Sequence, residues 1–64
     1  MKIYVDLFKN IIENLIIKNY NLDKERIFFI WDDVLYEIKI IDFKNKNEIF
    51  LNLEDIKNII IKWV

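Results

Sequence analysis

Apolar residues in the first third of the chain recur in pairs every four positions, with charged residues and asparagines between them. The pairs are Ile3/Tyr4, Leu7/Phe8, Ile11/Ile12 and Leu15/Ile16. This spacing predicts an amphipathic helix of four turns or more. Residues 2–5 either begin this helix or form a short strand before an N-cap at Asp6. The helix is expected to end at Asn19-Tyr20-Asn21, because asparagine tolerates the left-handed backbone conformation.

The middle of the chain changes to the period of two that is typical of strands. Arg26–Trp31 is short, aromatic and apolar on both faces, which predicts a strand covered on two sides. Asp32-Asp33 is interpreted as a tight turn. Val34–Phe43 alternates and is expected to be a long second strand. In this register Tyr36, Ile38 and Ile40 would face the helices, and Leu35, Ile41 and Phe43 the opposite side. Lys44–Asn47 is a second turn, and Glu48–Leu51 a short third strand.

The last segment carries the signals of a helix start. Asn52 is a suitable N-cap, and Asp55 stands three residues later, as in a capping box. Beyond it, one helix face is apolar: Leu53, Ile56, Ile59, Ile60 and Trp63. The predicted order is therefore helix, three-stranded antiparallel meander, helix. It indicates a single small α+β domain over residues 1–64, with both helices on one sheet face.

The composition shows more apolar residues than an ordinary globular domain has. Hydrophobic residues make up 55% of the 64-residue chain, above the roughly 45–50% of ordinary domains. Disulfides and imidazole or thiolate metal sites are excluded, because the chain has neither Cys nor His. A domain this small must then gain stability from a very apolar core, from self-association or from a partner. Contiguous apolar surface outside the core usually marks an interaction site.

Most catalytic chemistry is also excluded. Ser, Thr, Cys, His and Gly are all absent, which rules out nucleophilic triads, imidazole catalysis and phosphate-cradling glycine loops. The one acidic group worth weighing is Asp32, Asp33 and Glu37. It could hold Mg²⁺ or Ca²⁺ through oxygen ligands, but a solvated hairpin turn explains it more simply. We therefore expect no enzyme activity, cofactor or metal.

The sheet side opposite the helices is expected to carry the function. Two helices on one side leave the other side uncovered, and aromatic residues there are typical of interface hot spots. Three alternatives stay open: a register shifted by one or cover from the N-terminal residues, a homodimer or antitoxin-like protein, and a platform for single-stranded RNA. The candidate partner-binding residues are Phe28, Trp31, Leu35, Phe43 and Phe50.

Charge, hydropathy and codon bias limit the class of ligand, the cellular location and the kind of source genome. The net charge is −1, and Arg26 is the only arginine, so binding of duplex DNA is disfavoured. No apolar run reaches membrane-spanning length and no signal peptide is evident, so we expect a cytoplasmic protein. Ile, Lys and Asn make up half of the chain, which indicates a low-GC genome. The sequence thus favours a small protein-binding inhibitor or adaptor, and its size and codon bias fit one encoded by a phage or mobile element, such as an anti-CRISPR protein.

Overall fold

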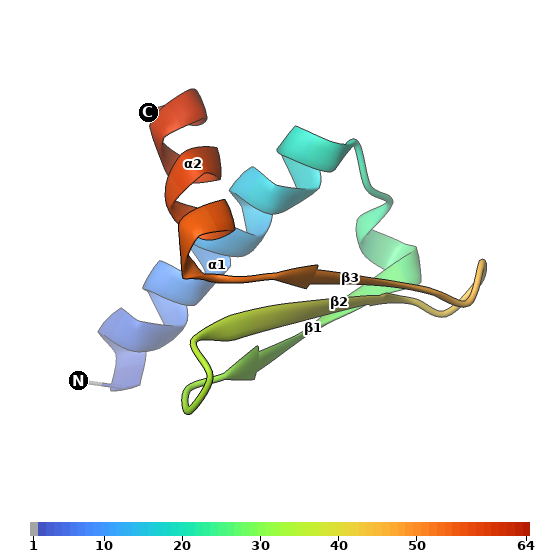
Figure 1. Cartoon of the computed structure of the whole chain (residues 1–64), viewed down its shortest axis with the longest axis horizontal. Coiled ribbons are helices and arrows are strands. Elements are labelled where there is room, and N and C mark those ends of the chain that lie inside the picture. Colours follow the sequence, from blue (N-terminus) through green and yellow to red (C-terminus); the bar gives the residue numbers. More distant parts are fainter. Residues whose placement is uncertain (1) are drawn as a thin grey trace.

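The computed structural model describes the backbone from Lys2 to Val64 and the side chains from Asp6 onward. The elements in chain order are α1 (Lys2–Tyr20), a 3₁₀ turn η1 (Lys24–Arg26), β1 (Ile27–Asp32), β2 (Glu37–Asp42), β3 (Asn47–Leu51) and α2 (Leu53–Trp63) (Figure 1). The α+β order expected from the sequence is confirmed. Of the two alternatives for residues 2–5, the structure has the helix.

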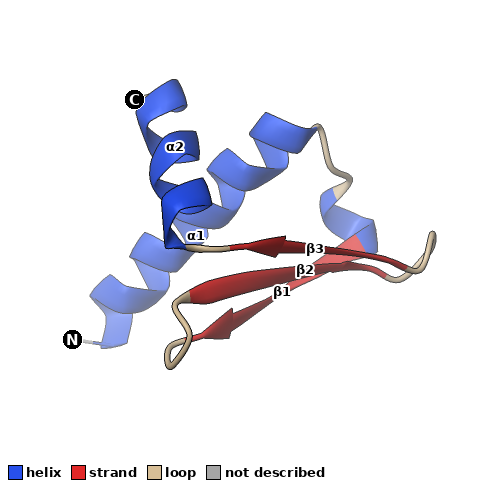
Figure 2. Ribbon diagram, viewed as in Figure 1, coloured by secondary structure: helices blue, strands red, loops and turns tan. Residues whose placement is uncertain are grey.

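The three strands form an antiparallel meander in the order β1-β2-β3, with β2 in the centre. Figure 2 shows the sheet as one layer, with the two helices crossing each other beside it. The buried core joins both α-helices and all three strands on one side of the sheet. Its members are Ile12 and Ile16 of α1, Ile27 of β1, Ile38 and Ile40 of β2, Leu51 of β3 and Ile59 of α2. Burial of Ile38 and Ile40 confirms the expected parity of β2.

The helix ends follow from local hydrogen bonding. Asn21 adopts the left-handed conformation with φ 53°, and the Leu22 N–H donates to the Ile17 carbonyl at 3.0 Å. This is the Schellman arrangement, and it satisfies a carbonyl that the helix would otherwise leave unpaired. At the start of α2 the predicted capping box is present: Asp55 N–H donates to Asn52 Oδ1 at 2.8 Å, and Asn52 N–H donates to Asp55 Oδ2 at 3.1 Å.

Both hairpin loops contain four residues and share one design. In the first loop the Asp32 carboxylate accepts bonds from the N–H groups two and three residues later. In the second, the Asp42 carboxylate does the same. Each loop closes on a residue in the left-handed region, Tyr36 at φ 54° and Lys46 at φ 57°. An aspartate that holds the turn amides in this way replaces the glycine-based turns that this chain cannot build.

The first loop corrects two expectations. The prediction of a strand from Val34 is wrong, because residues 33–36 form the loop and β2 begins at Glu37. Tyr36 therefore does not face the helices, and 67% of it is exposed. The period of two had extended through the loop because Val34 to Tyr36 are all residues that favour strands.

A glycine at the end of the second loop should stabilise the fold. The left-handed backbone at Lys46 is destabilised by steric contact of its Cβ atom, and glycine has no Cβ. We expect Lys46→Gly to raise the free energy of unfolding by about 0.5–1 kcal/mol, after allowance for the extra entropy of glycine in the unfolded chain. Urea denaturation of both proteins measures this change in the free energy of unfolding. Lys44→Gly is the control, since the φ of Lys44 is not positive, and it should lower stability. Equal effects of both substitutions would contradict the explanation.

Acid should remove the support that Asp42 gives to the second loop. Hydrogen bonds from the backbone of Asn45, and further ones from its side chain and from Lys44, lower the pKa of Asp42 below its usual 3.8. A depressed pKa means that the ionised carboxylate stabilises the folded state above pH 3.8 and that this contribution is lost as pH falls through the lower folded value. Thermal unfolding of wild type and Asp42→Asn should therefore differ at pH 7 and converge as the pH falls through the lowered pKa of Asp42. A difference that is independent of pH would show that the charge of Asp42 plays no part.

Candidate protein-interaction surface

One side of the sheet carries large apolar residues that neither helix covers. Directly paired residues of neighbouring strands point to the same side, and Phe28 pairs with Ile41 while Lys39 pairs with both Ile30 and Phe50. These residues alternate with the core positions, so they point away from the helices. We call this side the outer sheet face; its residues are Phe28, Ile30, Asp32, Glu37, Lys39, Ile41, Glu48 and Phe50.

Two of the exposed aromatic rings stack on each other. Phe43 follows β2 directly, and its N–H donates to the Arg26 carbonyl at 3.2 Å, which extends the β1–β2 ladder by one step. This bond places the Phe43 ring beside Phe28, with ring centroids 6.2 Å apart and an angle of 28° between the planes. Nearly half of Phe28 (47%) and more than half of Phe43 (56%) remain exposed. The pair is thus ordered and still accessible to a partner.

The β3 side of this face combines an aromatic ring with a neutralised charge. Lys39 Nζ lies 5.5 Å from the centroid of the Phe50 ring and 3.5 Å from Glu48 Oε1. Phe50 itself is 59% exposed. The lysine is therefore held over the ring by a cation–π contact and partnered by a carboxylate, so the centre of the face has little net charge.

The structure brings together three of the five residues proposed from the sequence. Phe28, Phe43 and Phe50 share the outer sheet face. Leu35 is 62% exposed, but it lies in the β1–β2 loop, at the opposite end of β2 from Phe43. Trp31 lies on the helix side, opposite Ile38 in the register, so its expected position with the outer aromatics is corrected.

Sequence reasoning missed Ile30. Its side chain is 43% exposed on the outer sheet face, two residues after Phe28 and on the same side of β1. The i, i+2 spacing carried this signal, but every residue from Ile27 to Trp31 is apolar, so the sequence alone did not say which parity points outward. We define the outer-face cluster as Phe28, Ile30, Ile41, Phe43 and Phe50.

The outer-face cluster is large enough to be an interaction site. An aromatic side chain carries 150–250 Å² of surface, so three half-exposed rings leave roughly 300 Å² accessible. The two isoleucines add to this, and the total reaches the size of the largest apolar patch on a typical monomer, roughly 300–600 Å². Such patches are often functional, whereas scattered exposed apolar residues need no explanation.

Trp31 instead ties β1 to α1. Its indole Nε1–H donates to Glu13 Oε2 at 2.7 Å, and Lys9 Nζ lies 5.2 Å from the ring centroid. The same ring lines an apolar recess of about 290 Å³ between the helices, together with Phe8, Leu53, Ile56 and Ile60. Trp31 therefore combines a structural hydrogen bond with a second accessible apolar surface, remote from the outer-face cluster.

The acidic loop residues support the turn. Both Oδ1 contacts of Asp32 are to backbone amides of its own loop, those of Val34 and Leu35. Among the residues whose side chains the structure describes, no three Asp or Glu residues come close enough to hold a metal ion. The described helices also include none that is both long and apolar enough to cross a membrane.

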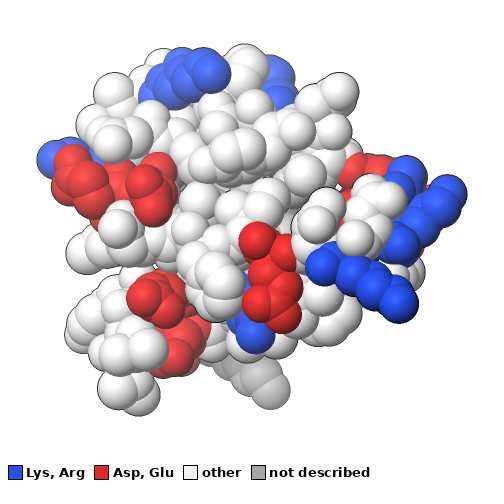
Figure 3. Space-filling model, turned by 45° about the vertical axis from the view of Figure 1, so that its right-hand side comes forward, with Lys and Arg blue, Asp and Glu red and all other residues white. Residues whose placement is uncertain are grey.

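Charges are dispersed over the surface. In the space-filling view the acidic and basic side chains form small separate groups with uncharged atoms between them (Figure 3). This distribution agrees with the net charge of −1. A partner attracted mainly by a strong field of one sign is therefore not favoured on this face.

Comparison of this chain with protein-family models, with curated proteins and with solved structures finds no match.

Replacing the structural tryptophan should lower stability. Trp31→Phe keeps a ring but removes the donor to Glu13, and a hydrogen bond to a charged group contributes more than one to a neutral group. We expect a loss of about 1–2 kcal/mol in urea denaturation. Trp63→Phe is the matched control, because the Trp63 indole donates to the neutral Asn19 amide at 3.0 Å; its loss should be smaller. A Trp31→Phe variant as stable as wild type would contradict this role.

Proposed function

We propose that this protein is a non-catalytic protein-binding module, an inhibitor or adaptor that docks on a partner through its outer-face cluster. The single observation that carries the proposal is the stacked Phe28–Phe43 pair, which stays about half exposed on a sheet face that no helix covers. Exposed apolar rings cost solvation free energy in the free protein, and a partner surface that covers them recovers it.

The expected mechanism is steric. Phe43 and Phe50 are the best anchors, because both are more than half exposed and can enter pockets on a partner without unfolding the domain. The Lys39–Glu48 pair between the strands presents both signs of charge beside them. Such mixed polar contacts set orientation more than affinity. Binding would then block or bridge a partner by occupying its surface.

A protein partner fits the face better than single-stranded RNA. Exposed aromatics can stack on bases, but nucleic-acid binding also needs unpaired positive charge along the backbone path. Lys39 is the one lysine of the outer sheet face, and it lies 3.5 Å from Glu48. An apolar cluster with charged residues around it is the usual composition of a protein interface, which has an apolar centre and a polar rim.

The biological setting remains a proposal drawn from the sequence. Small size and the dominance of Ile, Lys and Asn codons fit a gene of a low-GC phage or mobile element. An intracellular inhibitor of the anti-CRISPR kind needs only a folded scaffold and one docking surface. Adaptors and antitoxins meet the same requirements, and the docking experiment below applies to all three.

Truncation of either anchor should abolish docking and leave the fold intact. With affinity-tagged protein, wild type should retain a protein from a low-GC host extract, and Phe43→Ala or Phe50→Ala should each weaken that binding at least about tenfold, as for hot-spot residues. Their free energies of unfolding should stay within about 0.5 kcal/mol of wild type, since both side chains are more than half exposed.

Tyr36→Ala is the matched control, an aromatic residue 67% exposed in the β1–β2 loop, at the end of β2 away from Phe43. It should bind as wild type does. If the three variants lose binding equally, or if Phe43→Ala unfolds the domain, the surface is assigned wrongly. Retained material that disappears after nuclease treatment, with affinity that falls steeply as salt rises, would identify RNA as the ligand instead.

A further inference from the structure

β1 is an edge strand with one unpaired side. In an antiparallel ladder alternate residues hydrogen-bond to the neighbour. The bond from the Phe43 N–H to the Arg26 carbonyl sets this alternation, so the even-numbered residues of β1 bond to β2. The N–H and C=O groups of the odd-numbered residues point away from the sheet, and we call these groups the β1 edge; they belong to Ile27, Phe29 and Trp31.

The β1 edge lacks the features that normally protect a sheet edge. Natural edges carry charges, proline or a bulge, or are covered by another element. Here the five residues Ile27 to Trp31 are all uncharged, the chain has no proline, and the register with β2 is continuous without a bulge. Among the described residues, no backbone hydrogen bond outside the ladder uses the groups of this edge.

The opposite edge is protected. On β3 the residues bonded to β2 include Ile49, so Glu48 and Phe50 carry the outward N–H and C=O groups. Self-pairing centred on Glu48 would place two carboxylates against each other, which is destabilising. The strand is also shorter and leads directly into α2. The two edges of one sheet thus differ in a way that favours pairing only at β1.

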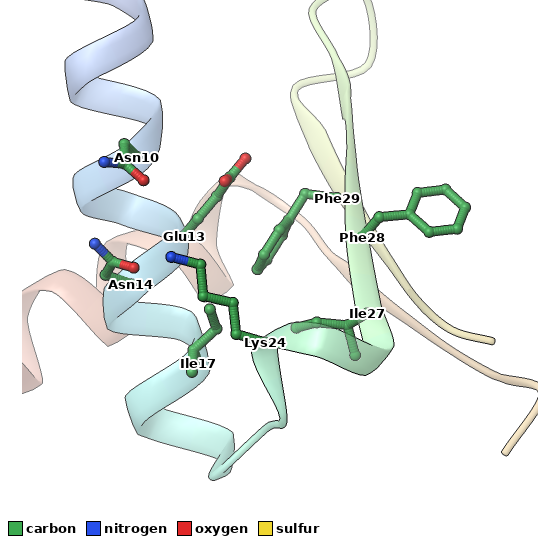
Figure 4. Close-up of a pocket in the computed structure, with 8 residues that line it drawn as sticks. All are labelled: Asn10, Glu13, Asn14, Ile17, Lys24, Ile27, Phe28 and Phe29. Carbon is green, nitrogen blue, oxygen red and sulfur yellow. The ribbon is translucent and has the colours of Figure 1, made fainter. Parts of the chain in front are cut away.

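A recess of about 270 Å³ lies between β1 and α1 on the helix side of the strand, and its α1 lining is Asn10, Glu13, Asn14 and Ile17. Figure 4 shows Phe29 pointing across this recess toward α1, whereas Phe28 points away on the other side of the strand. The α1 lining is mostly polar, with two amides and a carboxylate beside Ile17, so apolar side chains do not completely fill the space between β1 and α1.

We propose that the β1 edge pairs antiparallel with the β1 edge of a second copy of this chain, with the two-fold axis at Phe29. The odd-numbered positions are symmetric about Phe29, so Phe29 pairs with its counterpart and Ile27 with Trp31 of the other copy. Each of these is a hydrogen-bonded pair in an isologous interface. The product is a continuous six-stranded sheet.

Side chains on the outer sheet face complement each other in this register. Phe28 of one copy stands directly opposite Ile30 of the other, and an aromatic residue beside a β-branched one is a favourable cross-strand pair. No charged residue of β1 approaches another across the axis, since the strand has none before Asp32. A strand pair is smaller than a standard interface of roughly 1,200–2,000 Å², so the dimer should dissociate on dilution.

Removal of one N–H tests the pairing without changing a side chain. Chemical synthesis gives the 64-residue chain with an N-methyl group at Phe29, whose N–H points outward, and a matched control with N-methyl at Phe50, the outward position of the protected edge. Light scattering over a concentration series should give twice 8.0 kDa at high concentration for wild type and for the control, and 8.0 kDa throughout for N-methyl-Phe29.

Amide hydrogen exchange adds a second readout. In the wild-type dimer the amides of Ile27, Phe29 and Trp31 should exchange more slowly at high protein concentration than at low, because only pairing covers them. A wild-type chain that stays at 8.0 kDa at every concentration would overturn the proposal. A dimer that survives N-methylation at Phe29 would overturn it too, since association would then use another surface.

Disulfide cross-linking tests the register. The chain has no cysteine, so an equimolar mixture of Phe28→Cys and Ile30→Cys reports only the introduced thiols. Directly opposite residues have Cα atoms about 4.5 Å apart, within disulfide range, whereas diagonal neighbours are about 7–8 Å apart. The mixed 28–30 disulfide should therefore exceed its statistical share. Statistical amounts of the 28–28 and 30–30 products would overturn the register.

This inference does not rest on the proposed function, because it concerns an edge and not the outer-face cluster. Phe50→Ala should abolish partner docking and leave the dimer unchanged. Conversely, N-methyl-Phe29 should abolish the dimer and leave Phe43 and Phe50 exposed for docking. The two proposals can thus fail separately.

Discussion

Both helices of this molecule pack on the same face of its three-stranded sheet, and the rest of the structure depends on that arrangement. The apolar residues of the covered face, with Ile38 and Ile40 at its centre, form the core with Ile16 and Ile59 of the helices. The other face has no partner within the described chain and yet keeps Phe28 and Phe50 exposed. A sheet of this size has no second layer with which to bury them, and exposed apolar patches of this kind are often functional.

The position of α1 over the sheet is held by polar contacts from two tryptophans. The indole N–H of Trp31 binds Glu13, and that of Trp63 binds Asn19. Lys18 Nζ also lies 4.5 Å from the Trp63 ring centroid. Part of the polar face of α1 is therefore used within the molecule, joining β1 and α2 to the same helix.

Sequence patterns predicted the element order because each element carries its own signal. The alternation of Ile38 and Ile40 gave the correct parity for β2, and Asn52 with Asp55 gave the start of α2. The patterns failed where the signal was absent. β1 is apolar on both sides, so only its register with β2 shows that Trp31 points inward. The first loop lacks glycine and looks like strand, because the backbone of Tyr36 reaches the left-handed region with the help of the Asp32 carboxylate. The partner-binding role of the outer aromatics stays a prediction.

The hydrogen bond between Trp63 and Asn19 has a consequence for folding. The two residues are 44 positions apart, whereas both hairpins close over loops of four residues. Closing a long chain segment costs more entropy than closing a short one, so non-local contacts tend to form after local ones. The meander should therefore assemble first, and the docking of α2 against α1 should complete the core last. Until that step the helix side of the sheet lacks the cover of α2, and the transient species exposes apolar surface on both sides of the sheet. The tendency of this species to aggregate should depend on how quickly α2 packs against α1 and the sheet.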